Sequence, residues 1–276
     1  SLEEGSRCSI KIWAAGEGFE GAQYRLLTQI DRPHGDHKVL SLTWRNTGKG
    51  TRTPCLVSSG SDGSMKIWQC LNYRSFTDWG CSLSVKYRDC PCHQVACSSD
   101  GSILALAHKN LISLWDPDTL NLVEQLVSPT NHSITFLSFV EPRGIDGEVS
   151  GEAYLVYASH RSITVFNILT ATTVWTKIGI FNYCDVSRDG LPLLVVENDI
   201  KKNCYIVCIG SENNDINGTE KSKICYFEIL SDGVVYDRSL SKSSDVIALT
   251  ALRSLVVPNG SIGRVIVTLK NGQLVL

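Results

Sequence analysis

Short apolar or alternating segments recur along the whole chain, and no window carries the sustained i, i+3, i+4, i+7 apolar spacing of an amphipathic helix. Alternation with a period of two is typical of strands that bury one face. The pattern therefore predicts short strands at residues 39–44, 55–59, 65–68, 103–107, 111–115, 134–139, 154–158, 162–166, 191–196, 204–209, 224–230 and 264–269.

Turn signals separate these segments. Asp-Gly and Asn-Gly pairs supply the backbone conformations that tight β-turns require. They occur at Asp62-Gly63, Asp100-Gly101, Asp189-Gly190, Asp232-Gly233 and Asn271-Gly272. Many short strands joined by such turns indicate an all-β chain, and turn geometry accounts for these aspartates without a catalytic role.

The strands also repeat in a fixed order. In "SSGSDGSMKIW" (58–68), "SSDGSILALAHKNLISLWD" (98–116) and "YLVYASHRSITVFN" (154–167), an apolar strand, a tight turn and a second strand lead to an aromatic residue. The aromatic residues are Trp13, Trp68, Trp115 and Phe166, spaced roughly 50 residues apart, against roughly 40–45 residues in an ideal WD repeat. The Trp-Asp pair itself occurs at Trp115-Asp116, and a histidine precedes the first strand of a unit at His37 in "GDHKVLSLTW".

Six such units predict a WD-repeat β-propeller, for which about seven blades are expected. A blade cannot bury its faces alone, so successive blades stack to form one core. We therefore expect residues 1–276 to be a single propeller domain, with polar loop insertions near 142–152 and 210–223. The first and last units look incomplete, which suggests a fragment of a longer protein whose other strands close the propeller.

Composition and charge argue against several classes of function. Hydrophobic residues make up 43% of the chain, enough for a substantial core, and no apolar run approaches the roughly 20 residues that span a bilayer. The net charge of −2 argues against a domain whose main function is to bind the phosphate backbone of a nucleic acid. Small basic groups at Arg45/Lys49/Arg52 and Lys201-Lys202 fit either solvated loops or contact with an acidic partner or RNA. Eleven cysteines without regular spacing or a signal peptide indicate reduced thiols inside the cell.

The strongest candidate for chemistry is "CPCHQVACSSDG" (90–101), which contains Cys90, Cys92, His93 and Cys97. Structural zinc sites use Cys-x₂₋₄-Cys or His-x₃₋₅-His pairs, whereas Cys90 and Cys92 are separated by one residue. We favour a first blade strand followed by its turn. A metal site and a reactive thiol, and with them a metal- or thiol-dependent enzyme, are the alternatives.

Catalytic motifs are otherwise missing from the sequence, since it contains no G-x-S-x-G, H-E-x-x-H or P-loop pattern. The histidines are scattered over loops and strand starts: His34, His37, His93, His108, His132 and His160. We expect a non-enzyme without catalytic residues, cofactor, metal or small-molecule substrate, which binds protein partners through residues that the sequence does not identify.

The stretch from Trp79 to Leu126 resembles a specific family of WD-repeat proteins. Its features are Trp-x-Cys at 79–81, Lys86-Tyr87, Ser-x-Asp-Gly-Ser at 98–102 and "LWDPDTLNL". The stretch is similar to the nucleolar WD-repeat subunit of the UtpA (t-UTP) complex, of the yeast Nan-one type. In that family this stretch lies in the second of two propellers.

The resemblance implies a scaffold of the small-subunit processome, located in the nucleus and nucleolus, that supports pre-rRNA transcription and 18S rRNA maturation. The implied partners are the other t-UTP/UtpA subunits, with pre-rRNA and the small nucleolar RNP in the same assembly. The family brings no catalytic residues, and the Cys-rich "DCPCH" is outside its pattern. A WD-repeat scaffold in a ubiquitin ligase or a trafficking coat is the alternative of the same class.

Overall fold

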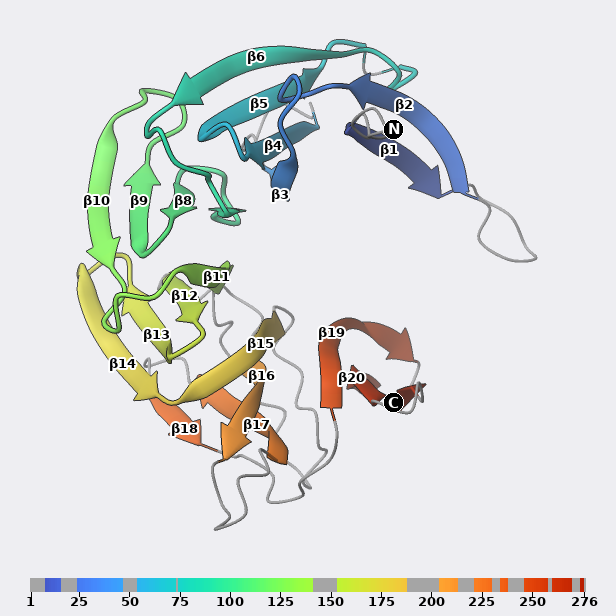
Figure 1. Ribbon diagram of the computed structural model, residues 1–276. Helices are drawn as coiled ribbons and strands as arrows, with labels where there is room; N and C mark the ends of the chain where they lie inside the picture. Colours follow the sequence, from blue (N-terminus) through green and yellow to red (C-terminus); the bar gives the residue numbers. More distant parts are fainter. Residues whose placement is uncertain are drawn as a thin grey trace, which may run out of the picture. The chain divides into compact units, whose positions relative to one another are not determined.

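The computed structural model describes residues 8–15, 24–46, 54–72, 74–140, 153–187, 204–212, 221–229, 234–237, 246–257, 260–269 and 274–275. All helix or strand elements within these ranges are β-strands (Figure 1), as the sequence pattern predicts. No helix in the described ranges is long and apolar enough to cross a membrane. The strands belong to two compact units, Ser1–Val127 and Ser128–Leu276.

The first unit contains three antiparallel sheets, in each of which neighbouring strands are also consecutive in sequence. The first sheet has two strands, β1 (Ser9–Ala15) and β2 (Tyr24–Asp31). The second has the order β3 (Val39–Arg45), β4 (Cys55–Gly60), β5 (Ser64–Cys70), β6 (Trp79–Lys86). The third has the order β7 (Gln94–Cys97), β8 (Leu104–His108), β9 (Leu111–Trp115), β10 (Leu122–Val127).

The second unit repeats this arrangement. One sheet has the order β11 (Ile134–Val140), β12 (Tyr154–Ser159), β13 (Ser162–Asn167), β14 (Thr172–Ile178). Another has the order β15 (Ile180–Ser187), β16 (Cys204–Glu212), β17 (Lys221–Ile229), β18 (Val235–Asp237). The last has three strands, β19 (Val246–Val257), β20 (Gly260–Leu269) and β21 (Leu274–Val275). Among the described residues, six sheets of sequential antiparallel strands agree with the six units predicted from the sequence.

The repeating aromatic residue occupies one structural position. The pairing of the third strand with the fourth shifts register by one residue next to this aromatic, at Trp13, Trp68, Trp115 and Phe166. Such a β-bulge bends and twists the outer strand. Because the bulge also occurs between β1 and β2, these two strands correspond to the third and fourth strands of the complete sheets.

Apolar faces stack between neighbouring sheets. In the first unit, Ile10 and Ile12 of β1 pack against Leu56 and Trp68 of the second sheet. The opposite face of that sheet packs against the third sheet, and this core contains Cys55, Val57, Met65, Ile67, Cys92, Val95, Cys97, Leu104 and Leu106. In the second unit, side chains of β11–β14 share one core with Phe181, Cys225, Phe227 and Ile229. Burial on both faces of a sheet is what a stack of blades requires.

Eleven of the twelve predicted segments coincide with strands, and the segment 191–196 lies outside the described residues. The predicted loop 210–223 is partly wrong, because β16 continues to Glu212 and β17 begins at Lys221, with Glu212 opposite Lys221 in register. Backbone hydrogen bonds extend this hairpin without apolar side chains, so a polar sequence gave no sign of it. Residues 213–220 and the predicted loop 142–152 lie outside the described residues.

Two of the predicted Asp-Gly turns are described, and both are confirmed. Gly63 and Gly101 each have a φ of +79°, a conformation that favours glycine. In each turn the aspartate accepts the backbone N–H of the residue two positions later, at 3.0 Å from Asp62 to Ser64 and at 3.0 Å from Asp100 to Ser102. The other three pairs, at 189–190, 232–233 and 271–272, lie outside the described residues.

Candidate functional site

The Cys-rich segment connects β6 to β7 and lies against the Asp62-Gly63 turn of the preceding sheet. The backbone N–H of Cys92 donates to the carbonyl of Gly60 at 3.1 Å, and that of His93 donates to Ala107 at 2.9 Å. A side-chain carbon at Gly63 would lie 2.7 Å from the carbonyl oxygen of Cys90, so the turn and the segment are in close contact. These backbone contacts make "CPCH" a packed connection between two sheets.

The thiols of this segment are mostly inaccessible. Cys92 is 0% exposed and packs with Cys55 and Cys97 in the core between the second and third sheets. Burial raises the pKa of both Cys92 and Cys97 to about 12. Both are therefore protonated at neutral pH, and a protonated thiol is neither a nucleophile nor a metal ligand.

The side chains of Cys90, Cys92, His93 and Cys97 do not converge on a site. Val95 and Cys97 face the core together, as the strand alternation predicts, and Cys90 is partly exposed in the connection. Among the residues that the structure describes, no three His, Cys, Asp or Glu side chains lie close enough together to hold a metal ion.

Alkylation measures the reactivity of these thiols directly. At pH 8 we expect iodoacetamide to label the exposed Cys81 and to leave Cys92 and Cys97 unlabelled until the protein unfolds. A thiol with a pKa of about 12 is a thiolate in only ~10⁻⁴ of molecules at this pH, and burial blocks the reagent as well. Peptide mass spectrometry reads out each site, and labelling of Cys92 at the rate of Cys81 would contradict the packed conformation.

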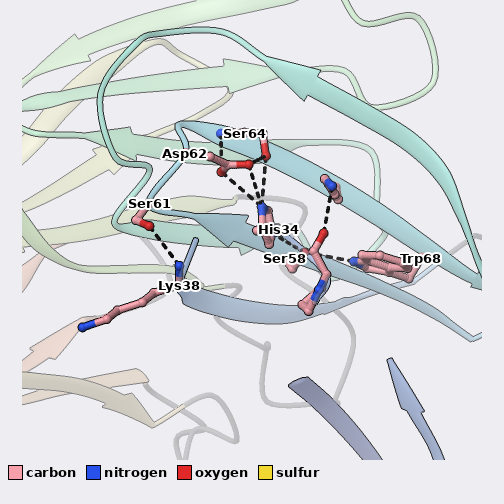
Figure 2. A network of polar contacts seen from close by, with 9 residues as sticks. His34, Lys38, Ser58, Ser61, Asp62, Ser64 and Trp68 are labelled. Atoms are coloured by element: carbon pink, nitrogen blue, oxygen red, sulfur yellow. Dashed lines mark hydrogen bonds and ion pairs between the residues drawn. The ribbon is translucent and has the colours of Figure 1, made fainter. Parts of the chain in front are cut away.

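A buried polar network lies in the second sheet (Figure 2). His34, in the connection from β2 to β3, contacts Ser58 Oγ through Nε2 at 2.9 Å and Asp62 Oδ1 through Nδ1 at 3.1 Å. Trp68 Nε1 donates to the same Ser58 Oγ at 2.9 Å, and Ser64 Oγ donates to Asp62 Oδ2 at 2.6 Å. The chain of contacts joins β4, β5 and two turns.

The protonation states of the network follow from burial. Burial lowers the pKa of His34 although the Asp62 carboxylate opposes the change, so the ring is neutral at pH 7. Burial of Asp62 acts against its ionisation, but hydrogen bonds from Ser64 and His34 hold its pKa below the ordinary value. We assign the proton to Nδ1, which donates to Asp62, so that Nε2 accepts from Ser58. Ser58 Oγ then accepts from Trp68 Nε1 and donates to His34 Nε2.

Two histidines precede β3, as the strand begins at Val39, and His34 rather than His37 makes the contacts of the network. His37 donates only its backbone N–H, to the carbonyl of His34, at 3.2 Å. The connection from β2 to β3 folds back through Gly35, whose φ is +65°, and this turns the earlier histidine inward. Spacing along the sequence could not separate the two residues.

Two other sheets have different contacts in place of this network. The second sheet has Ser58 opposite Lys66, and the third sheet has Leu106 opposite Ser113 at the equivalent position. The ring of Tyr87 packs edge-on against that of Trp115, with 4.8 Å between the ring centroids. In the sheet β11–β14, Thr130 contacts Ser159 and Ser162 through hydroxyl groups at 3.2 and 3.3 Å. Each set ties a connection to its own sheet, which is a structural role.

Arg45 was a candidate for contact with an acidic partner or RNA, and the structure gives it an internal role instead. Its guanidinium donates through Nε to the carbonyl of Gly101 at 3.0 Å and through Nη2 to Asp118 at 2.6 Å. These contacts join the second and third sheets. Lys49, Arg52 and Lys201-Lys202 lie outside the described residues.

The described surface is suited to binding other macromolecules. Large apolar side chains that are exposed include Trp13, Tyr24, Leu42, Trp44, Leu71 and Phe76. Exposed aromatic side chains of this kind are enriched where proteins bind one another.

Comparison with known proteins gives a consistent result. A family model described as "WD repeat-containing protein 75 second beta-propeller" matches residues 2–190. The protein named WD repeat-containing protein 75 from Xenopus laevis is 30% identical, over 60% of this chain and 19% of its own length. The human protein of that name is 26% identical, again over 60% of this chain and 19% of its own length. U3 small nucleolar RNA-associated protein 17 of Schizosaccharomyces pombe is 22% identical over 61% of this chain and 20% of its own length. The chain thus spans about a fifth of the length of these relatives.

Proposed function

Because the chain belongs to the family of the second β-propeller of WD repeat-containing protein 75, we propose that its protein is a non-catalytic scaffold of the t-UTP (UtpA) complex. In this role it supports pre-rRNA transcription and 18S rRNA maturation within the small-subunit processome. The family match over residues 2–190 is the observation that carries the proposal. The Schizosaccharomyces pombe relative, whose name associates it with U3 small nucleolar RNA, supports it.

The described structure agrees with a scaffold. Its polar groups, including His34, Asp62 and Arg45, are engaged in holding sheets and turns together. A scaffold needs a rigid frame with exposed binding surfaces, and stacked antiparallel sheets with exposed aromatic side chains provide both. The name of the pombe relative leads us to place the protein in the nucleolus.

We propose that the other t-UTP/UtpA subunits are the direct partners. Pre-rRNA and the small nucleolar RNP are then components of the same assembly that this propeller does not bind through a general attraction for phosphate, because its net charge is −2. We also propose that residues 1–276 belong to one propeller domain.

Depletion of the full-length protein tests the proposed role. We expect newly made 18S rRNA to fall relative to large-subunit rRNA, because the processome acts on the small-subunit precursor. Pulse labelling of rRNA measures the ratio, and re-expression of the full-length protein is the control. An unchanged ratio after complete depletion would refute a role in 18S maturation.

A further inference from the structure

We propose that Leu120, Leu122 and Val123, which we call the β10 patch, bind a segment of a partner protein in which apolar side chains lie beside lysine or arginine. The inference deepens the proposed scaffold role by naming one surface that serves it. It rests on that role only for the expectation that the partner is a t-UTP subunit.

The β10 patch begins in the turn from β9 to β10. Leu120 has a φ of +59°, a left-handed conformation that favours glycine and is unusual for a bulky side chain. Its backbone N–H donates to the carbonyl of Asp116 at 2.9 Å, and Asp116 Oδ1 accepts the backbone N–H of Asp118 at 2.8 Å. Leu120 is nevertheless 39% exposed, so it does not belong to the core. A strained residue that the fold does not bury points to a function.

The corresponding turn from β13 to β14 shows that this geometry does not require a leucine. Asn167 takes the place of Asp116 there, and its Oδ1 accepts the backbone N–H of Leu169 at 2.9 Å. The left-handed position is occupied by Ala171, with a φ of +52°. The same turn thus forms around a single methyl group, and the turn itself does not account for the side chain of Leu120.

The β10 patch continues at a β-bulge in the outer strand of the third sheet (Figure 1). Leu122 is opposite Trp115 and Glu124 is opposite Leu114, so Val123 has no residue opposite it. A bulge interrupts the alternation of a strand. The successive residues Leu122 and Val123 are accordingly both exposed, at 43% and 54%.

The equivalent bulges of two other sheets carry different side chains. At the two corresponding positions β6 has Cys81 and Ser82, and β14 has Thr173 and Val174. Of these three outer strands, β10 is the one in which both positions are aliphatic. Exposed aliphatic side chains at both bulge positions and at the turn therefore distinguish the third sheet from its repeats.

The charges around the β10 patch specify the partner. Residues 110–127 include three carboxylates, those of Asp116, Asp118 and Glu124, and no lysine or arginine. Arg45 contacts Asp118, but the arginine side chain is only 8% exposed, whereas that of Asp118 is 74% exposed. The patch therefore presents negative charge to a partner, which favours a positively charged segment and disfavours an RNA backbone.

The β10 patch is attached to a rigid part of the fold. Nη2 of Arg45 donates to Asp118 at 2.6 Å, and Nε of the same guanidinium donates to the carbonyl of Gly101 at 3.0 Å. These contacts tie the turn from β9 to β10 to the end of β3. A surface that is ordered before binding loses little conformational entropy when the partner arrives.

Site-specific photo-crosslinking of the tagged full-length protein in growing cells tests the proposal. Leu122 is replaced by the photoreactive p-benzoyl-phenylalanine, and mass spectrometry identifies the crosslinked peptide. We expect a peptide of a t-UTP subunit with lysine or arginine beside apolar residues. The exposed Leu169 is the control position, from which this peptide should be absent. Crosslinks from Leu122 only to RNA, to an acidic peptide or to this chain itself would overturn the proposal.

Two pairs of variants measure the contribution of the β10 patch. We expect Leu120→Gly and Val123→Ser each to raise the Kd for the purified crosslinked subunit by about tenfold. The urea midpoint should be kept, because glycine relieves the strain at φ +59° and Val123 is exposed. Ala171→Gly and Val174→Ser are the matched controls at the equivalent positions and should leave the Kd unchanged. An unchanged Kd for both patch variants would refute the binding surface.

The β10 patch and the t-UTP role fail in different ways. If the unmodified protein recovers t-UTP subunits but Leu122 crosslinks to none of them, the t-UTP role stands and the β10 patch is refuted. If no t-UTP subunit is recovered and Leu122 crosslinks to a basic, apolar segment of a different protein, the t-UTP role is refuted and the binding surface stands.

Discussion

Gly101→Ala is expected to destabilise the protein by about 3 kcal/mol or more. The φ of +79° at this position costs a residue with a side chain ~1–2 kcal/mol. The added carbon would also overlap the carbonyl oxygen of Asn46, so the turn and the end of β3 would have to separate, at a cost of ~1–3 kcal/mol. Urea unfolding followed by tryptophan fluorescence measures the difference.

Gly35→Ala is the matched control. Its φ is +65°, but no atom lies within 4 Å of the added carbon, so only the conformational cost of about 1 kcal/mol applies. The difference between the two variants isolates the close approach of the Gly101 turn to β3. Equal destabilisation by both substitutions would show that this approach does not occur in solution.

The second large effect is expected for Ser58→Ala, at about 2–4 kcal/mol. Ser58 Oγ accepts from Trp68 Nε1 and donates to His34 Nε2, so its removal leaves two buried groups without partners. Each such group costs ~1–3 kcal/mol, partly relieved if water enters. Ser82→Ala is the control, because Ser82 lies on the exposed β6 and contacts only the carbonyl of Ile67, at 3.2 Å. A loss for Ser58→Ala no greater than that for Ser82→Ala would refute the network of Figure 2.

The sequence predicted the second and third strands of the sheets well and the fourth strands poorly. β4 and β12 are buried at every position, so their apolar composition is visible in the sequence. β6 reads "WGCSLSVK" and β14 reads "TTVWTKI". Half of the side chains of β6 and most of those of β14 are exposed, and none is buried. An outer strand is held by backbone hydrogen bonds along one edge. Because these bonds do not depend on the side chains, the amino-acid composition does not reveal such a strand.

The contacts of the candidate site could not be predicted from residue types either. A cysteine-rich segment with a histidine suggests chemistry when only residue types are known, but the structure uses Cys92 as a small buried side chain. The network built on His34 depends on a turn that brings residues 34, 58 and 68 together across three segments. Contacts between sheets such as that of Arg45 with Gly101 depend on the stacking of two repeats, which periodicity alone does not specify.

Affinity purification of the tagged full-length protein from growing cells tests the central claim most directly. Membership of the t-UTP complex predicts that the other t-UTP subunits are recovered in near-equal amounts, together with U3 small nucleolar RNA, and that the subunits remain bound after RNase treatment while the RNA is lost. A folded, nuclear protein that recovers no t-UTP subunit, or one whose subunits are all released by RNase, would contradict the account.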